Sequence, residues 1–172
     1  KSKPVVVTEH SSWLNTIEKI PFWKRKLLQW FQKKVRFFLP VSKNLGLKLV
    51  EMGVEKNKII SVANVIDTNI FYYKEMLINE KTNFLHVSNF KEHHKNINGI
   101  LNTIANLDKK GFDFIFNFVG DGDIQPLIKK SKNLGITPSK ITFHTTKTGV
   151  ELANFFQTAD VMCRTQGKNP CI

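Results

Sequence analysis

The chain has 172 residues, of which 41% are hydrophobic, so it has room for one domain with a real core, or for one domain and part of another. The formal net charge of +12 indicates an anionic partner, which could be a phosphorylated ligand, an acidic membrane surface or a nucleic acid. No apolar run reaches the length that spans a bilayer. The chain opens without an initiator methionine or a signal peptide, and we expect further residues to precede it in the intact protein.

The first part of the chain alternates β-branched runs with helical stretches. Strands are predicted over residues 4–8, 37–42 and 59–63, and helices over 21–36 and 43–52. Pro21 suits the first turn of a helix, Ser42 suits an N-cap, and Gly53 suits the position just after a helix.

Residues 64–80 show no clear period and predict a connector between two α/β segments. Beyond it the alternation resumes. Strands are predicted over 84–87, 112–119, 141–144 and 160–163, and helices over 96–110, 124–134 and 149–158. This order predicts an α/β fold, with a Rossmann-like parallel sheet that carries helices on both faces.

Two of the predicted turns have features of a phosphate site. The turn after residues 84–87 contains Lys91 and Lys95, and the turn after 112–119 contains Gly120 and Gly122. Such turns lie at the carboxyl ends of parallel strands, where ligands bind, and glycine exposes backbone N–H groups. The alternatives are a solvated lysine at a helix start and glycines that only permit a tight turn. A dinucleotide fingerprint is excluded, because Gln125 stands where its third glycine would fall.

Histidines and cysteines suggest no metal site. His10 directly follows a predicted strand, where it would act in proton transfer or bind an anion, or would be an ordinary loop histidine. Cys163 and Cys171 fit no metal-ligand spacing with the histidines, and reduced thiols are expected.

The segment 13–36 is basic and aromatic, with seven lysines and arginines and one acidic residue, Glu18. On a helical wheel its apolar side chains share one broad arc and most lysines lie opposite. This pattern fits a helix on anionic lipid through residues 19–36, and it equally fits an amphipathic helix packed on a sheet. Nucleic-acid binding is not favoured, because no nucleic-acid-binding motif accompanies the charge.

Seven segments in order resemble the motifs of one enzyme family. They are Val5-Val-Val-Thr-Glu-His10, Phe38-Leu-Pro-Val-Ser42, residues 60–71, Leu85-His-Val-Ser-Asn-Phe90 with Lys95, Phe118-Val-Gly-Asp-Gly122, Ile141-Thr-Phe-His144 and residues 151–161. With these segments the chain resembles the retaining family 4 (group 1) glycosyltransferases of the two-lobed GT-B fold, as a partial chain.

The resemblance implies transfer of a sugar, with retention, from a nucleotide-diphospho-sugar to a glycan or lipid-linked acceptor. It implies a role in cell-surface polysaccharide synthesis at the cytoplasmic face of the membrane, and no required metal or other cofactor. Residues 1–66 would belong to the acceptor lobe, 67–80 to the connector and 81–172 to the donor lobe. His10 would lie near the transferred sugar, and the donor would contact Asn89, Lys91, Lys95, Gly120, Asp121, Gly122, His144 and Thr145.

The sequence departs from the family pattern at several positions. Asn89 replaces the family's arginine, Val65 and Thr145 replace glycines, and the family's Glu-x7-Glu motif does not follow Val161. These departures leave an alternative, a truncated module that binds a nucleotide or a membrane without catalysis. For the same reason we expect the chain by itself to be a poor catalyst.

Overall fold

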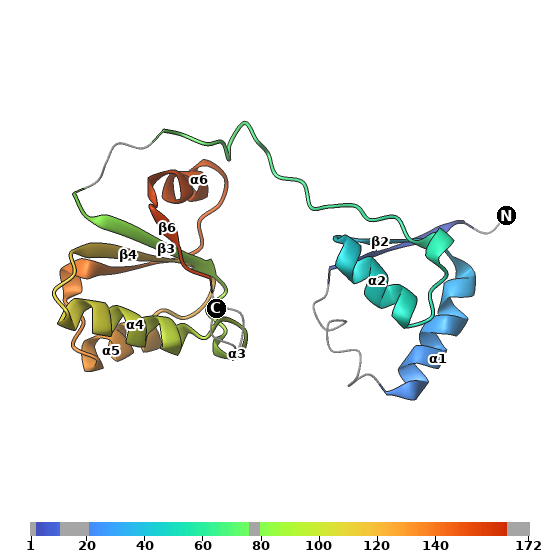
Figure 1. Cartoon of the computed structure of the whole chain (residues 1–172), viewed down its shortest axis with the longest axis horizontal. Coiled ribbons are helices and arrows are strands. Elements are labelled where there is room, and N and C mark those ends of the chain that lie inside the picture. Colours follow the sequence, from blue (N-terminus) through green and yellow to red (C-terminus); the bar gives the residue numbers. More distant parts are fainter. Residues whose placement is uncertain (1–2, 11–20, 76–79, 165–172) are drawn as a thin grey trace. The chain divides into compact units, whose positions relative to one another are not determined.

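The structure, a computed structural model, describes residues 3–10, 21–75 and 80–164. The chain divides into two compact units, Lys1–Ile66 and Asp67–Ile172 (Figure 1). Each unit has a hydrophobic core of its own. The division falls where the predicted connector begins, and the assignment of the units to acceptor and donor lobes stays a prediction.

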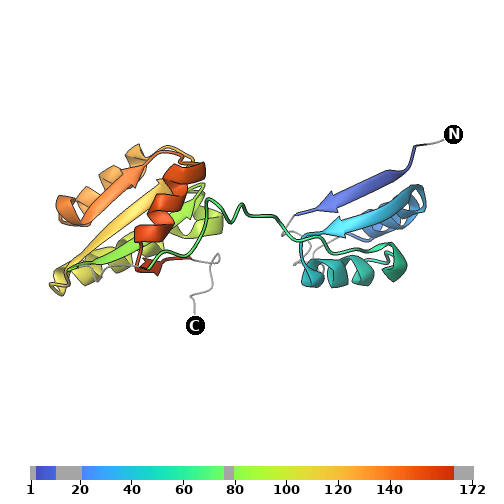
Figure 2. The ribbon, with the colours of Figure 1, turned by 90° about the horizontal axis from the view of Figure 1, so that it is seen from above.

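The first unit is built on two parallel strands, β1 (Val5–Glu9) and β2 (Val35–Pro40), which lie side by side with arrowheads in the same direction in Figure 2. Between them lie α1 (Phe22–Phe31) and a 3-10 turn, η2 (Gln32–Lys34), and after them come α2 (Lys43–Glu51) and η3 (Lys56–Lys58). The core combines buried residues of β2 and α2 with two from the turn beyond, and its members are Val35, Phe38, Leu45, Leu49, Met52 and Val54.

Polar side chains fix the ends of these elements. The Ser42 hydroxyl accepts a hydrogen bond from the Leu45 N–H at 3.2 Å, which confirms the predicted N-cap of α2. The buried Gln32 side chain donates to the Gly53 carbonyl at 2.7 Å and accepts from the Glu55 N–H at 3.0 Å. Gln32 therefore provides hydrogen-bond partners to two backbone groups just after α2.

The second unit is a four-stranded parallel sheet in the order β5-β4-β3-β6. Its strands are β3 (Thr82–Ser88), β4 (Phe114–Gly120), β5 (Ile141–His144) and β6 (Val161–Met162). Its helices are α3 (Glu92–Lys95), α4 (Ile97–Lys109), α5 (Gln125–Asn133), the 3-10 turn η4 (Pro138–Lys140) and α6 (Gly149–Thr158). The helices α4 and α5 lie on one side of the sheet and α6 lies on the other (Figure 1). The predicted fold class is confirmed.

Phenylalanines of β4 form the centre of this second core. Phe114, Phe116 and Phe118 alternate along the strand and are almost fully buried, since alternate residues of a strand point to the same face. They pack against the apolar side of α4, which contributes Ile97, Ile100, Leu101, Ile104 and Ala105. This packing holds the sheet against α4 and so positions the ends of its strands.

The prediction of a strand over residues 59–63 is wrong, because these residues do not form a regular strand. Ile59 makes a single parallel bridge to Phe38, and the N–H groups of Ile60 and Val62 donate to carbonyls of β2 at 2.9 and 3.0 Å. Ile60 and Val62 are each 47% exposed. The β-branched run therefore lies along β2 in extended form, but it lacks the packing on its faces that a full strand would have.

Other boundaries differ by up to five residues. The helix predicted over 21–36 ends at Phe31, because residues 35–40 form β2, where Val35 is buried in the core. The strand predicted from residue 112 begins at Phe114, because the Phe112 N–H still donates to the Leu107 carbonyl and closes the end of α4 around Gly111. The strand predicted over 37–42 runs from Val35 to Pro40. The short helix α3 was not predicted, and Asn96, in the left-handed conformation at φ 44°, separates it from α4.

Candidate functional site

The carboxyl ends of β3, β4 and β5 meet at one edge of the second sheet. Ser88 lies opposite Gly120, and Val119 lies opposite His144, in the parallel register. The Asp121 N–H donates to the Ser88 carbonyl at 3.2 Å, and the Thr146 hydroxyl donates to the Gly120 carbonyl at 3.4 Å. The structure thus brings the predicted donor residues of the three turns to the same edge, where ligands of parallel sheets bind.

The turn after β3 is held in an unusual conformation. Phe90 has a φ of 53°, in the left-handed region that large side chains avoid. Its N–H donates to the Ser88 hydroxyl at 3.1 Å, and the Lys91 N–H donates to the Asn89 side-chain oxygen at 3.3 Å. Asn89 is exposed, and its side-chain oxygen holds the backbone of its own turn.

Behind this turn lies a buried histidine that was not predicted as a site residue. His86 is 2% exposed, its Nδ1 lies 2.8 Å from the Cys163 carbonyl oxygen, and its Nε2 lies 2.8 Å from the Ser88 hydroxyl. A carbonyl only accepts, so Nδ1 carries the proton and Nε2 accepts from Ser88. Burial lowers the pKa of His86 despite the hydrogen bond to Cys163, and the nearby Lys95 ammonium lowers it further.

The two candidate lysines of this turn differ in their surroundings. Lys91 is exposed at the start of α3, whereas Lys95 ends α3 and is half-buried. The Glu92 carboxylate accepts from the Asn98 N–H at 2.9 Å, and the Asn96 side chain accepts from the Gly99 N–H at 3.2 Å. The first amides of α4 thus already have partners within the chain.

The glycines of the second turn have a packing role. A side chain at Gly120 would run into the Ser88 carbonyl, because β3 and β4 approach closely there. Gly122 has a φ of 136°, and a Cβ atom there would lie 3.3 Å from the Asn89 carbonyl oxygen. Asp121 is exposed beside them. Both glycines allow the two turns to touch, which explains these positions before any ligand is considered.

The third turn contributes His144 and Thr145. Thr145 is exposed. His144 faces the α6 side of the sheet, where its Nε2 donates to the Asn117 side-chain oxygen at 2.9 Å and its ring lies 4.7 Å from that of Phe155. Burial, followed by the charge of Lys147, lowers the pKa of His144.

His10, the predicted catalytic residue, belongs to the other unit. It is exposed and follows β1, beside the end of β2, where the Val41 N–H donates to the Glu9 carbonyl at 3.1 Å. Like the lysines of the second unit, it therefore lies at the carboxyl end of a parallel sheet. Its predicted role stays a prediction.

The described residues offer no metal centre. Among residues 3–10, 21–75 and 80–164, no three side chains of histidine, cysteine, aspartate or glutamate gather closely enough to hold an ion. Burial raises the pKa of the Cys163 thiol, so this cysteine is protonated near neutral pH. Ser88, His86 and Asn117 were not among the predicted site residues. Their only sequence signal is that they are polar residues within strongly apolar strands, which predicts buried hydrogen bonds.

Comparison with known proteins identifies the fold. No family model and no curated protein sequence matches the chain. Several solved structures match the chain. One is Anabaena Alr3699/HepE in complex with UDP-glucose, at 13% sequence identity and a TM-score of 0.72; the match covers 95% of this chain and 47% of that one. A glycosyltransferase from Rickettsia africae ESF-5 matches at 16% identity and a TM-score of 0.68, over 94% of this chain and 45% of that one.

A third match is the pneumococcal O-GlcNAc transferase GtfA in complex with UDP and GlcNAc, at 16% identity and a TM-score of 0.69. It covers 95% of this chain and 33% of GtfA. The chain thus spans between a third and a half of the length of these structures. At such low identity the likeness shows the fold alone, and that fold is a glycosyltransferase-like α/β fold of the GT-B type.

Proposed function

We propose that this chain belongs to a glycosyltransferase that moves a sugar, with retention, from a nucleotide-diphospho-sugar to a glycan or lipid-linked acceptor. One observation carries the proposal. In a fold shared with proteins solved with UDP or UDP-glucose, a turn bearing Lys91 and Lys95 meets a glycine turn at the carboxyl edge of the sheet. The proposed setting is cell-surface polysaccharide synthesis at the cytoplasmic face of the membrane, within the family 4 enzymes.

The proposed chemistry assigns distinct tasks to the two units. Transfer breaks the bond between the sugar C1 and the donor diphosphate, so negative charge builds up on the departing phosphate oxygens. The Lys95 ammonium, supported by Lys91, would stabilise that charge without a metal. Thr145 and His144 would lie near the nucleobase, and backbone groups of residues 120–122 near the nucleotide. His10, from the first unit, would lie near the transferred sugar.

Nucleotide binding tests the donor site directly. Calorimetric titration with UDP, GDP and ADP is expected to show micromolar binding of one nucleotide. Lys95→Ala is expected to weaken this binding by about tenfold, the usual contribution of a charge-assisted hydrogen bond to affinity. Lys110→Ala, at an exposed lysine after α4, is the matched control.

Two results would contradict the proposal. One is the absence of binding by all three nucleotides, and the other is equal binding by the Lys95 and Lys110 variants. A turnover assay with UDP- and GDP-sugars is the second measurement. The chain spans at most half of the matched structures, so little turnover is expected from it alone.

A further inference from the structure

The helix α1 turns its aromatic side chains away from the core of the first unit. No residue of α1 is buried, and Leu28 is its one side chain that packs against the cluster of buried residues described above. Phe22 is 72% exposed, Trp23 62%, Trp30 56% and Leu27 55%. The core of the first unit thus covers only a small part of the apolar side of this helix.

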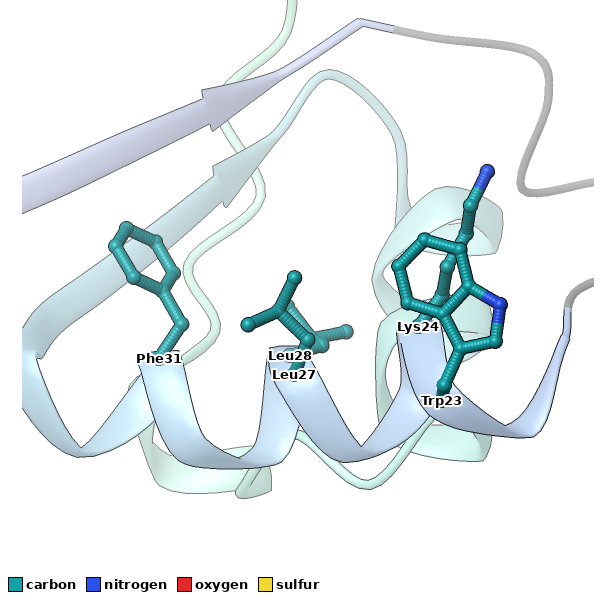
Figure 3. A pocket seen from close by; sticks show the side chains of 5 residues that line it. All are labelled: Trp23, Lys24, Leu27, Leu28 and Phe31. Atoms are coloured by element: carbon teal, nitrogen blue, oxygen red, sulfur yellow. The ribbon is translucent and has the colours of Figure 1, made fainter.

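A hollow runs along part of this face. Its volume is about 440 Å³, and it is lined by Trp23, Lys24, Leu27, Leu28 and Phe31, which lie on one side of α1 (Figure 3). Trp23, Leu27 and Phe31 are spaced four residues apart and therefore form a row along the helix. Such a concentration of large apolar side chains on an exposed helix indicates a surface that is covered by something else.

The basic side chains on this face indicate the chemistry of the partner that would cover it. From Pro21 to Pro40 the sequence has six basic residues and no acidic one. Three lysines lie over exposed aromatic rings: Lys24 at 5.5 Å from the Trp23 ring centre, Lys26 at 5.4 Å from that of Phe22, and Lys34 at 4.6 Å from that of Trp30. A partner must therefore be apolar and anionic at once, which describes the headgroup region of an acidic bilayer.

We propose that α1 docks the protein onto an anionic lipid bilayer. The helix would lie in the plane of the surface, with Phe22, Trp23, Leu27 and Trp30 at the boundary of headgroups and acyl chains and the lysines on the phosphates. Tryptophan and lysine suit this boundary because each combines an apolar body with a polar tip. Ten residues rise only about 15 Å, and no helix that the structure describes could cross a membrane. This inference does not depend on the proposed sugar transfer.

Vesicle binding is the test. The chain is floated with vesicles of equimolar phosphatidylcholine and phosphatidylglycerol, and with vesicles of phosphatidylcholine alone. We expect binding to the anionic vesicles only, weakened by added salt. The double variant Trp23→Ala/Trp30→Ala is expected to bind about tenfold less tightly. Lys24→Gln/Lys26→Gln is expected to bind about tenfold less tightly or weaker still, since each basic residue near such a surface raises the affinity about fivefold.

Matched controls lie on the other unit. Tyr73→Ala removes an aromatic side chain that is 89% exposed, and Lys129→Gln/Lys132→Gln removes two exposed lysines of α5; both are expected to bind as the unaltered chain does. Because every tryptophan lies within residues 1–66, a blue shift of tryptophan emission on vesicle addition reports insertion of this unit.

Three outcomes would overturn the proposal. The first is no binding to anionic vesicles, and the second is equal binding by the tryptophan variant and the Tyr73 control. The third is an absence of vesicle binding together with a concentration-dependent dimer, detected by light scattering, that the tryptophan substitutions dissociate. That result would assign the face to a second copy of the chain.

Discussion

At the scale of single residues, the neutral form of His86 holds the turn after β3. Its Nδ1–H donates to the Cys163 carbonyl, and its Nε2 accepts from Ser88, whose oxygen in turn accepts from Phe90. A proton on Nε2 would leave the Ser88 hydroxyl without this acceptor and would add a charge beside Lys95. The left-handed Phe90 is therefore stabilised by a chain of hydrogen bonds that depends on the protonation state of one buried ring.

The first prediction concerns the pH dependence of stability. Because burial lowers the pKa of His86 in the folded state, its contribution is present above the unfolded pKa of about 6.5 and is lost as the pH falls through the folded value. His86→Phe is expected to lower the free energy of unfolding by about 2–4 kcal/mol at neutral pH, since Ser88 and Cys163 lose a partner.

Urea unfolding from about pH 8 to about pH 5.5 measures both effects. The difference between the unaltered chain and the variant should shrink as the pH falls. A difference that stays constant, or grows, would show that His86 is not held neutral in the folded protein.

The second prediction concerns Gly120. Alanine there would place a methyl group against the Ser88 carbonyl at the point where β3 and β4 are closest, so Gly120→Ala should destabilise the second unit by about 3 kcal/mol or more. Gly111→Ala is the control, because Gly111 has a positive φ but no atom within 4 Å of the added carbon, and it should cost only about 1 kcal/mol. Thermal unfolding distinguishes them, and equal losses would refute a steric role for Gly120.

At the scale of elements, α4 is tied to the turn before β5 by one carboxylate. Asp108 accepts from the Thr137 N–H at 2.7 Å and pairs with Lys140 at 2.9 Å, and Lys140 also donates to the Phe112 carbonyl at 2.7 Å. The hydrogen bond from Thr137, followed by that from Lys140, lowers the pKa of Asp108. Asp108 and Lys140 together therefore connect the end of α4, η4 and the residue that follows Gly111.

The third prediction tests this connection. Asp108→Ala is expected to cost about 1–3 kcal/mol at neutral pH, because it leaves the Thr137 N–H and the Lys140 charge without their acceptor. Asp113→Ala removes an ion pair with Lys81 in which both side chains are about half exposed, and it should cost about 0–1 kcal/mol.

Acid unfolding extends the same experiment. The Asp108 contribution is present above the unfolded pKa of about 3.9 and is lost as the pH falls through the lower folded value. A loss for Asp108→Ala that equals the loss for Asp113→Ala would show that the carboxylate does not connect these elements.

At the scale of the whole molecule, the two units have cores of unequal size. Among the residues that the structure describes, the core of the first unit has six buried hydrophobic residues beside a two-stranded sheet, whereas that of the second has ten beside a four-stranded sheet. Stability grows with the apolar surface that a unit buries, and a sheet of two strands is marginal without other support. The units should therefore differ in stability.

The fourth prediction follows from this difference. Hydrogen exchange measured by mass spectrometry should show slower exchange for the amides of β3 and β4 than for those of β1 and β2, by about tenfold or more. Comparable exchange in the two sheets would mean that the units open together, or that the first core is stronger than its buried residues indicate.

The sequence by itself determined the local features of this protein. Most of the alternation of β runs and helices was predicted correctly, and so were the N-cap at Ser42 and the ends of helices before Gly53, Gly111 and Gly135. These features depend on side chains within a few residues of one another. The same reasoning placed the candidate lysines and glycines in turns after strands, and the parallel sheet brings those turns to one edge.

Only the tertiary structure decided the relations between distant residues. The Cys163 carbonyl lies 77 positions from His86 in the chain, so no local pattern identified the ring as the support of the turn after β3. The run at 59–63 has strand propensity but lacks the packing of a full strand, and the apolar arc of α1 faces outward because Leu28 alone meets the core. Periodicity shows that a helix has an apolar face, whereas the neighbours that fold against it determine whether that face is buried.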